Sequence, residues 1–160
     1  MKTIIVYTSK TGTTEKCVNI LKQALKDAAV IDLNQTEPAL AEYDLVIIGS
    51  PIRVGKIDAK IKVFINQNKE LLKTKKTAYF ICCGFEKDTE RYFKTNIPDD
   101  LLKMAVIYCS FGGEMDLAKQ KGIDKMIVRL VKMSKEGKKD IKINEKKIKL
   151  FIQKISQDGR

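Results

Sequence analysis

The sequence predicts an α/β fold, a three-layer sandwich in which helices cover both faces of a five-stranded parallel sheet. The apolar runs are short, rich in β-branched residues and without polar alternation, as in strands that are buried on both faces. Segments with helical spacing separate most of these runs, which is the pattern of a parallel sheet. The 160 residues contain no internal repeat and no linker, so residues 1–160 are expected to form a single domain.

Five segments have the composition of buried strands. The first reads Thr-Ile-Ile-Val-Tyr and the third reads Leu-Val-Ile-Ile-Gly, both without a charged residue. The predicted strands cover residues 3–7, 29–33, 45–49, 77–83 and 104–109. A sheet of five strands at this chain length favours the spatial order 2-1-3-4-5 over the six-stranded order of dinucleotide-binding domains.

Apolar residues with helical spacing predict the segments that cover this sheet. The spacing predicts helices over residues 17–28 and 59–72, and an amphipathic helix over residues 123–133. A last helix is predicted to begin after Asn144, whose side chain suits an N-cap. The polar segment 86–102 is predicted to be partly helical at best.

The absence of histidine excludes several kinds of chemistry. Without an imidazole the chain cannot form a His-ligated zinc site, a Ser–His–Asp relay or a Cys–His pair. No metal site is predicted. Any chemistry must therefore come from a bound cofactor, from carboxylates or lysines, or from cysteine without an imidazole partner.

The four cysteines are interpreted as reduced thiols. They form no CxxC pair and no regular framework, which favours a cytoplasmic protein: Cys17, Cys82, Cys83 and Cys109. Adjacent strand residues point to opposite faces, so Cys82 and Cys83 are interpreted as small buried residues and not as a redox pair. The apolar runs are also too short for a signal peptide or a membrane span.

The net charge of +11 is concentrated in the last quarter of the chain. Of 31 basic and 20 acidic residues, 14 basic and five acidic ones lie in residues 119–160. Such a block fits nucleic acid, an acidic protein or anionic lipid, or is simply a solvated surface. Nucleic acid is not expected, because the block lacks interleaved aromatic residues. The helix over 123–133 either packs on the sheet or rests on an anionic membrane surface.

Ligands of such a sheet bind beyond the carboxyl ends of its strands, where the strand order reverses. The loops at residues 8–14, 50–57, 84–86 and 110–116 lie there. The first opens a helix, whose unpaired N–H groups and positive dipole end attract an anion. It combines five hydroxyl side chains with a lysine and a glycine: Thr8, Ser9, Lys10, Thr11, Gly12, Thr13 and Thr14. The alternative is a plain capping turn rich in Ser and Thr.

Other phosphate-binding patterns do not fit this loop. The chain has no GxxxxGK[ST] motif and no GxGxxG after the first strand, so a P-loop NTPase and a dinucleotide-binding domain are unsupported. Residues 9–14 instead resemble the phosphate loop of the flavodoxins, in which hydroxyl and glycine residues surround the phosphate of FMN. The resemblance implies the five-stranded flavodoxin-like order 2-1-3-4-5 and FMN as the cofactor.

The resemblance extends to the second and third loops. The second loop looks like the family's segment beside the isoalloxazine ring of FMN, and the third falls where the family covers the other side of the ring. The implied cofactor site therefore adds Ser50, Pro51, Ile52, Arg53, Val54, Gly55, Lys56, Cys83, Gly84 and Phe85 to the first loop, and the glycines that follow the fifth strand, Gly112 and Gly113, complete the predicted site.

Several of these residues have an expected role and an alternative. Arg53 and Lys56 are expected near the N1–O2 edge of the ring, or else are exposed loop cations. Phe85 is the best aromatic candidate to cover the ring in a chain without tryptophan, or else is ordinary packing. Gly112 and Gly113 let the chain pass close to the ligand, or form an ordinary turn.

Two segments are similar to the menaquinone-dependent protoporphyrinogen oxidases of the flavodoxin family. They read Gly-Ser-Pro-Ile-Arg-Val-Gly at residues 49–55 and Ile-Val-Arg-Leu-Val-Lys-Met-Ser at residues 127–134. The resemblance implies an FMN-dependent oxidoreductase on the inner face of the membrane that oxidises a haem precursor and reduces a quinone or another redox partner. The alternative is a non-catalytic electron carrier. Carriers of this family are typically acidic, whereas this chain is basic.

Overall fold

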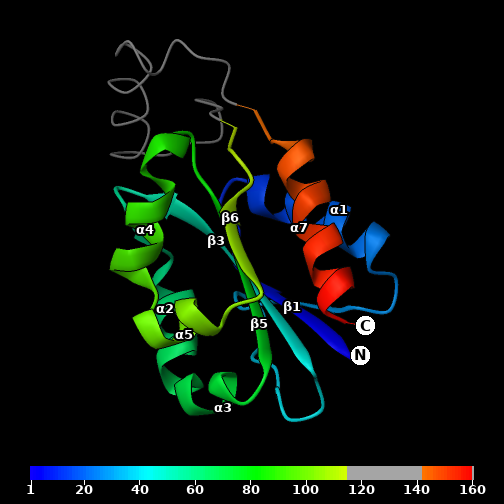
Figure 1. Cartoon of the computed structure of the whole chain (residues 1–160). Helices are drawn as coiled ribbons and strands as arrows, with labels where there is room; N and C mark the ends of the chain where they lie inside the picture. Colours follow the sequence, from blue (N-terminus) through cyan, green and yellow to red (C-terminus); the bar gives the residue numbers. More distant parts are fainter. Residues whose placement is uncertain (115–141, 160) are drawn as a thin grey trace, which may run out of the picture.

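The sheet has the predicted strand order. The computed structural model describes residues 1–114 and 142–159. Five parallel strands are arranged as β2-β1-β3-β5-β6, and a short strand, β4, pairs antiparallel with β3. Without β4 this is the order 2-1-3-4-5. Helices lie on both sides of the sheet in Figure 1, which confirms the α/β three-layer architecture.

Most strands begin and end close to the predicted residues. They are β1 (Thr3–Tyr7), β2 (Ala29–Asp32), β3 (Leu45–Arg53), β4 (Lys56–Ile57), β5 (Lys76–Cys82) and β6 (Ile107–Ser110). The strand β3 continues past Gly49 because its last residues pair with β4 in a hairpin, with Ile52 opposite Ile57. The last strand begins at Ile107 and not at residue 104, because Met104 is the final residue of a helix.

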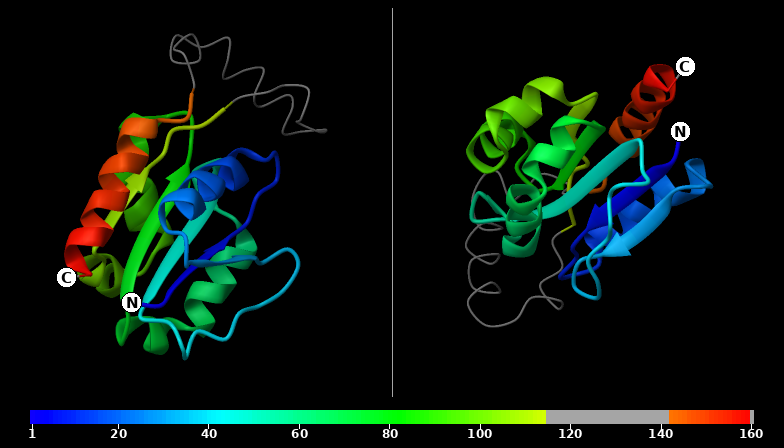
Figure 2. Two further views of the ribbon diagram at one scale, coloured as in Figure 1. Left: turned by 90° about the vertical axis from the view of Figure 1, so that its right-hand side faces the viewer. Right: turned by 90° about the horizontal axis from the view of Figure 1, so that it is seen from below.

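One face of the sheet is covered by α1 (Thr13–Ala24) and α7 (Glu145–Asp158). These helices lie side by side in Figures 1 and 2. Asn144 caps α7 as predicted, since its Oδ1 accepts a hydrogen bond from Lys147 N at 3.2 Å. The first helix ends earlier than predicted, because the backbone of Leu25 leaves the helical region.

The other face is covered by short helices. They are α2 (Ala59–Gln67), α3 (Lys69–Lys73), α4 (Thr89–Asn96) and α5 (Asp99–Met104), with a 3-10 turn at Glu86–Asp88. The helix predicted over 59–72 is broken at Asn68, which ends α2 and precedes α3. The prediction for 86–102 was wrong, because this segment is mainly helical. Its helices are short and mostly polar, and each buries only two side chains, so the apolar period is hard to recognise.

Successive strand residues enter different cores, which explains why the strands lack polar alternation. Ile4 and Val6 of β1 pack in the core under α2 to α5, whereas Ile5 and Tyr7 pack in the core under α1 and α7. Both faces of the strand are therefore buried. Gly49 is required in β3, since a Cβ there would collide with the ring of Phe80.

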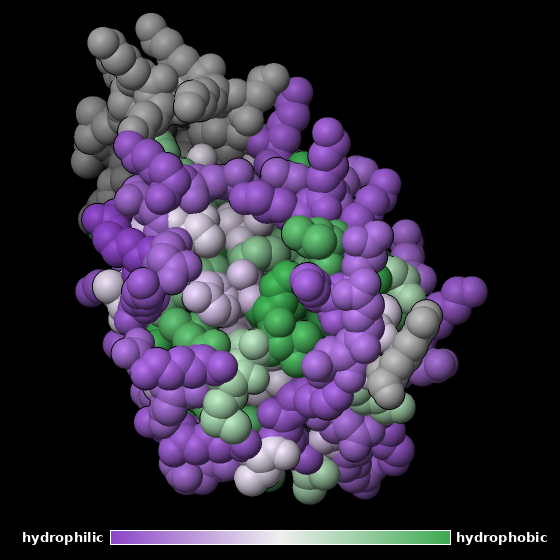
Figure 3. Space-filling view, in the orientation of Figure 1, coloured by the Kyte–Doolittle hydropathy of each residue, from purple (hydrophilic) through white to green (hydrophobic). Residues whose placement is uncertain are grey.

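The strand β6 lies at the edge of the sheet and is half-buried over Ile107–Cys109. In Figure 3 apolar residues gather in the middle of this face, bordered by hydrophilic side chains. Within the described ranges no helix combines the length and hydropathy needed to cross a membrane. The helix predicted over 123–133 and the end of the 110–116 loop lie outside the described residues.

Candidate functional site

The loops of the predicted site follow the carboxyl ends of β1, β3, β5 and β6, at the upper edge of the sheet in Figure 1. The parallel register places Tyr7 beside Gly49 and Gly49 beside Phe80. The first, second and third loops therefore leave neighbouring strands at the same edge. The structure thus brings together segments that lie up to about 80 residues apart in the sequence.

Two hydroxyls of the first loop are buried without a partner. The side chain of Thr8 is fully buried and that of Thr14 is 1% exposed. Neither Oγ1 atom has a hydrogen-bond partner of ordinary geometry among residues 1–114 and 142–159, although the Thr14 hydroxyl lies near enough to the Cys82 thiol to lower the pKa of that thiol. An unpaired buried hydroxyl costs about 1–3 kcal/mol, so such groups are rare unless a ligand or water meets them. A ligand at the first loop would satisfy this pair, whereas the third such group, the Tyr79 hydroxyl, lies in the core under α2 to α5.

Gly12 stands at an open position at the start of α1. Gly12 is the N-cap of α1 and has a φ of +90°, and nothing lies within 4 Å of the position that its Cβ would take. Gly12 N donates a hydrogen bond to Ser9 Oγ at 3.1 Å. Thr11 is half-buried and Thr13 is buried in the first turn of α1. The N-terminal N–H groups of α1 are therefore available to an anion.

Lys10 connects the first loop to the second. Its Nζ lies 3.6 Å from Asp58 Oδ2, and the Lys10 side chain is about half exposed. Asp58 is the N-cap of α2, where its Oδ1 accepts a hydrogen bond from Lys60 N at 2.9 Å. The cation of Lys10 therefore lies over the base of the second loop instead of pointing only into water.

The second loop is a tight β-hairpin. Arg53 lies opposite Lys56 in the register of β3 and β4, so two cationic residues face each other across it. Between them Val54 and Gly55 have φ values of +50° and +72°, as a two-residue hairpin turn of type I′ requires. Val54 is 77% exposed. A β-branched residue is strained at positive φ, so contacts with the surrounding structure are needed to keep this turn in place.

Ser50 holds the base of this hairpin. Its hydroxyl is buried, donates to Pro51 O at 2.9 Å and accepts from Asp58 N at 2.9 Å. Its hydrogen is therefore already used within the second loop. The structure places Ser50 at the predicted site in a supporting position, while Pro51 and Ile52 are half-buried in the last part of β3.

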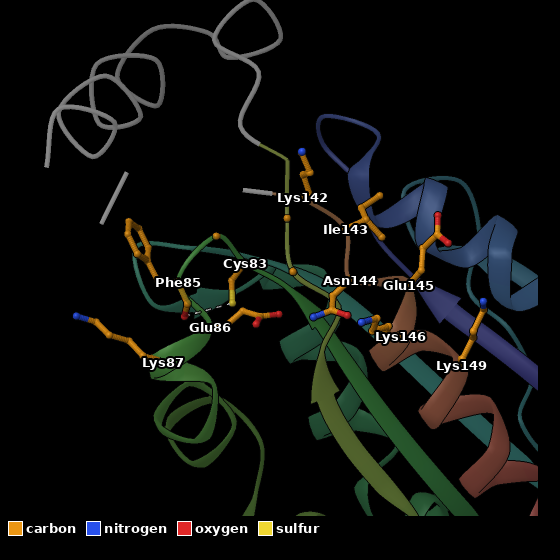
Figure 4. Close-up of a pocket in the computed structure, with 13 residues that line it drawn as sticks. Cys83, Phe85, Glu86, Lys87, Lys142, Ile143, Asn144, Glu145, Lys146 and Lys149 are labelled. Atoms are coloured by element: carbon orange, nitrogen blue, oxygen red, sulfur yellow. Dashed lines mark hydrogen bonds between the residues drawn. The ribbon is translucent and has the colours of Figure 1, made fainter. Parts of the chain in front are cut away.

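The third loop lines a cavity of about 740 Å³. Figure 4 shows Phe85 and Lys87 on one side of this cavity and Lys146 and Lys149 of α7 on the other. The lining residues that the structure describes are Cys83, Gly84, Phe85, Glu86, Lys87, Gly112, Gly113, Lys142, Ile143, Asn144, Glu145, Lys146 and Lys149. None of these comes from the first or second loop, so the described lining of the cavity does not include the hairpin.

The two glycines after β6 are required by neighbouring backbone. Gly112 has a φ of +74°, and a Cβ there would collide with the carbonyl of Lys142. A Cβ on Gly113 would come within 3.0 Å of the carbonyl carbon of Cys83. Both glycines also line the cavity, and that they let the chain pass close to a ligand stays a prediction.

Cys17, Cys82 and Cys83 are buried and Cys109 is half-buried, and Cys82 and Cys83 point to different cores, as predicted. Cys82 packs under α1 and α7, whereas Cys83 packs on the opposite face. Cys82 Sγ lies 3.7 Å from Cys17 Sγ, and this contact together with burial raises the pKa of Cys82 well above the ordinary thiol value. Burial also raises the pKa of Cys83 and brings that of Cys109 to about 12. Neutral buried thiols are poor nucleophiles, so the structure gives them a packing role.

Two asparagines near the site were not singled out from the sequence. Asn34 Nδ2 donates to Ser9 O at 3.4 Å, and the amide of Asn96 bonds to the backbone of the second loop. Both act across 25 or more residues of chain. No local sequence pattern marks such residues, because their role comes from hydrogen bonds to backbone groups that are distant in the sequence and meet them only in the folded chain.

Residues 4–142 match the flavodoxin domain family. The chain belongs to this family. A curated relative, the protoporphyrinogen IX dehydrogenase (quinone) of Escherichia coli, is 28% identical over 85 residues, which are 50% of this chain and 47% of that enzyme. The match thus spans about half the length of this relative.

Solved structures share the same fold. The rubredoxin oxygen:oxidoreductase of Desulfovibrio gigas is 16% identical with a TM-score of 0.59, over 98% of this chain and 35% of that one. A flavoprotein from Lactobacillus acidophilus, solved in complex with FMN, is 18% identical with a TM-score of 0.56, over 68% of this chain and 92% of that one. At these identities the likeness shows the fold alone.

Proposed function

We propose that this chain binds FMN at the carboxyl edge of the sheet, with the phosphate in the loop 8–14. The observation that carries the proposal is the pair of buried, unpartnered hydroxyls of Thr8 and Thr14 next to the open N-terminus of α1. A phosphate accepts hydrogen bonds from hydroxyls and from helical N–H groups, so it would satisfy both sets. The residues present therefore fit the group.

The ring of FMN would be held by the second and third loops. On one side the hairpin carries the cations of Arg53 and Lys56, and on the other side Phe85 is half-buried. Positive charge beside the N1–O2 edge favours the negative charge that reduction places there. Bound FMN supplies the redox chemistry by taking up and releasing electrons, and the protein holds the ring and sets its potential.

We further propose that the chain is an oxidoreductase, coupled to a quinone or another redox partner and acting on a protoporphyrinogen-like substrate. The similarity to the Escherichia coli enzyme supports this proposal, as does the cavity beside Phe85. Its volume of about 740 Å³ is within the range of small-molecule sites, and lysines lie at its rim. The second candidate is a flavodoxin-type electron carrier. The net charge of +11 favours the enzyme, since carriers of the family are typically acidic.

The proposed place of action is the cytoplasmic side of an anionic membrane surface. This proposal is supported by the basic excess of residues 119–160, which attracts anionic lipid at low ionic strength. Nucleic acid is not proposed as a partner. Most of the residues concerned lie outside the described ranges, so the proposal rests on their charge.

The test combines a spectrum with a turnover assay. The purified protein is expected to bind FMN stoichiometrically and to show steady turnover when supplied with a porphyrinogen and a soluble menaquinone analogue. Bound FMN that is reduced and reoxidised without steady turnover would favour the carrier. A protein that takes up no FMN would contradict the proposal.

A further inference from the structure

The side-chain amide of Asn96, the last residue of α4, holds the turn of the β3–β4 hairpin. Its Oδ1 accepts a hydrogen bond from Ile57 N at 3.1 Å, and its Nδ2 donates one to Gly55 O at 2.8 Å. The same Nδ2 donates to Tyr92 O at 2.7 Å, which fixes the amide against its own helix. One side chain therefore pairs with a donor and an acceptor on the hairpin backbone.

The hairpin needs such external support. The strand β4 has two residues, and a two-stranded hairpin of this size is marginally stable in water. Val54 at its tip has a φ of +50°, a conformation that is costly for a β-branched residue. The backbone groups of Gly55 and Ile57 face α4 and require partners. Asn96 supplies both partners, as a neighbouring strand would.

The helix α4 connects the two walls of the proposed ring site. The 3-10 turn Glu86–Asp88 begins at the end of the third loop and leads into α4. Asn96, the last residue of α4, holds the second loop. Tyr92, one turn before Asn96, lies under the hairpin, with its ring 3.6 Å from the position of a Cβ on Gly55. The eight residues of α4 are a rigid spacer of roughly 12 Å.

We infer that Asn96 is a positioning residue that fixes the hairpin relative to the third loop, and thereby sets the environment of the flavin ring between them. This inference rests on the proposed FMN site and adds to it a residue from a helix outside the four site loops. Asn96 acts through the backbone of Gly55 and Ile57, not by contact with the flavin.

Two substitutions at Asn96 and one matched control test this inference. Asn96→Leu removes both bonds to the hairpin at similar side-chain volume. Asn96→Asp keeps an acceptor for Ile57 N and loses the donor to Gly55 O. The control is Asn68→Leu, because Asn68 Nδ2 donates to Phe64 O of its own helix, at the far end of α2.

The first readout is amide hydrogen exchange of Ile57, measured by NMR in the FMN-free protein. Exchange is expected to be about ten-fold faster in Asn96→Leu, the effect of about one lost hydrogen bond, and unchanged in Asn68→Leu. The second readout uses the FMN-loaded protein. Asn96→Leu is expected to weaken FMN binding about ten-fold and to shift the midpoint potential of the flavin, while Asn68→Leu does neither. Asn96→Asp is expected to keep the Ile57 protection and to lower the potential, because it adds negative charge near the ring.

Two results would overturn the inference. If Ile57 exchange is the same in Asn96→Leu and in the wild type, the amide does not hold the hairpin. If exchange is faster but FMN affinity and potential match the Asn68→Leu control, the hairpin does not set the ring environment. If Asn96→Leu does not fold, the FMN affinity and midpoint potential of Asn96→Asp are compared with those of the Asn68→Leu control, and values that match the control overturn the inference. If the wild type binds no FMN, the proposed function fails, and with it the claim that Asn96 sets the environment of the flavin ring. The claim that Asn96 holds the hairpin is still decided by the exchange rate of the Ile57 amide.

Discussion

At the scale of single residues, buried hydroxyls distinguish the loop 8–14 from an ordinary helix cap. In a cap, a Ser or Thr side chain accepts a hydrogen bond from a backbone N–H of the first turn. In the described structure α1 has no such side-chain cap, and Thr8 and Thr14 lack partners. An unpaired buried hydroxyl is destabilising, and under the proposed function these two gain partners when the phosphate binds. Removing one of these hydroxyls is therefore expected to stabilise the ligand-free protein and to weaken ligand binding.

Thr8→Val tests this opposition. Valine has nearly the same shape and no hydroxyl, so the variant is expected to raise the unfolding free energy of the FMN-free protein by about 1 kcal/mol. It is expected to weaken FMN binding about ten-fold, because one hydrogen bond to the phosphate is lost. Denaturant unfolding and FMN titration measure the two effects. Thr77→Val, at a buried position near the start of β5, is the control that should leave FMN affinity unchanged. A Thr8→Val protein that binds FMN like the wild type would remove Thr8 from the site.

The buried thiols predict how stability depends on alkaline pH. Burial raises the pKa of Cys109 from 9.0 to about 12. Between these values the unfolded chain has lost the thiol proton while the folded chain keeps it, so the unfolding free energy falls as pH rises from 9 to 12. Below pH 9 this contribution is constant. Cys109→Ala should therefore show a shallower decline than the wild type in urea unfolding between pH 9 and 11. Equal slopes would contradict the buried, neutral state of Cys109.

At the scale of elements, the β3–β4 hairpin stores strain at an exposed position. A type I′ turn favours Asn-Gly, and this chain has Val-Gly at residues 54–55. Val54 is 77% exposed at φ +50°, so its side chain gains little from burial and is costly for the backbone. Such strain persists only where the surrounding structure enforces it, here through Asn96 and Ser50.

Val54→Asn is expected to relieve this strain. The substitution creates the preferred Asn-Gly turn and should raise the unfolding free energy by about 1 kcal/mol. The matched control is Val63→Asn, because Val63 is also exposed but lies in α2, where valine and asparagine have similar helix propensity. Thermal or urea unfolding of both variants gives the comparison. A Val54→Asn protein no more stable than the control would show that the turn carries no appreciable strain.

The sequence predicts elements more reliably than the contacts between them. Strands such as 3–7 and 45–49 were predictable because residues buried on both faces leave an uninterrupted apolar run. The helices α4 and α5 were not, because each is short and buries only two side chains. Loop 8–14 was predictable because its residues are contiguous. The role of Asn96 was not, because its partners are about 40 residues away and are backbone atoms.

At the scale of the whole molecule, the charge is divided unevenly along the chain. Residues 1–118 carry 17 basic and 15 acidic groups, whereas residues 119–160 carry 14 and five. The protein is therefore expected to co-sediment with vesicles that contain anionic lipid and not with neutral ones, and to be released by salt. If the protein co-sediments with neither kind of vesicle, the basic residues 119–160 form a solvated surface that does not bind lipid.

The phosphate at the loop 8–14 is the central claim, and a comparison of FMN with riboflavin tests it most directly. Riboflavin carries the same ring without the phosphate. The FMN-free protein is titrated with each ligand, as the wild type and as the double variant Thr11→Asp/Thr14→Asp. We predict that the wild type binds FMN at least ~10-fold more tightly than riboflavin, and that the added carboxylates weaken FMN at least ~10-fold while riboflavin binding is unchanged. Equal affinities for the two ligands, or FMN binding that survives both substitutions, would contradict the account.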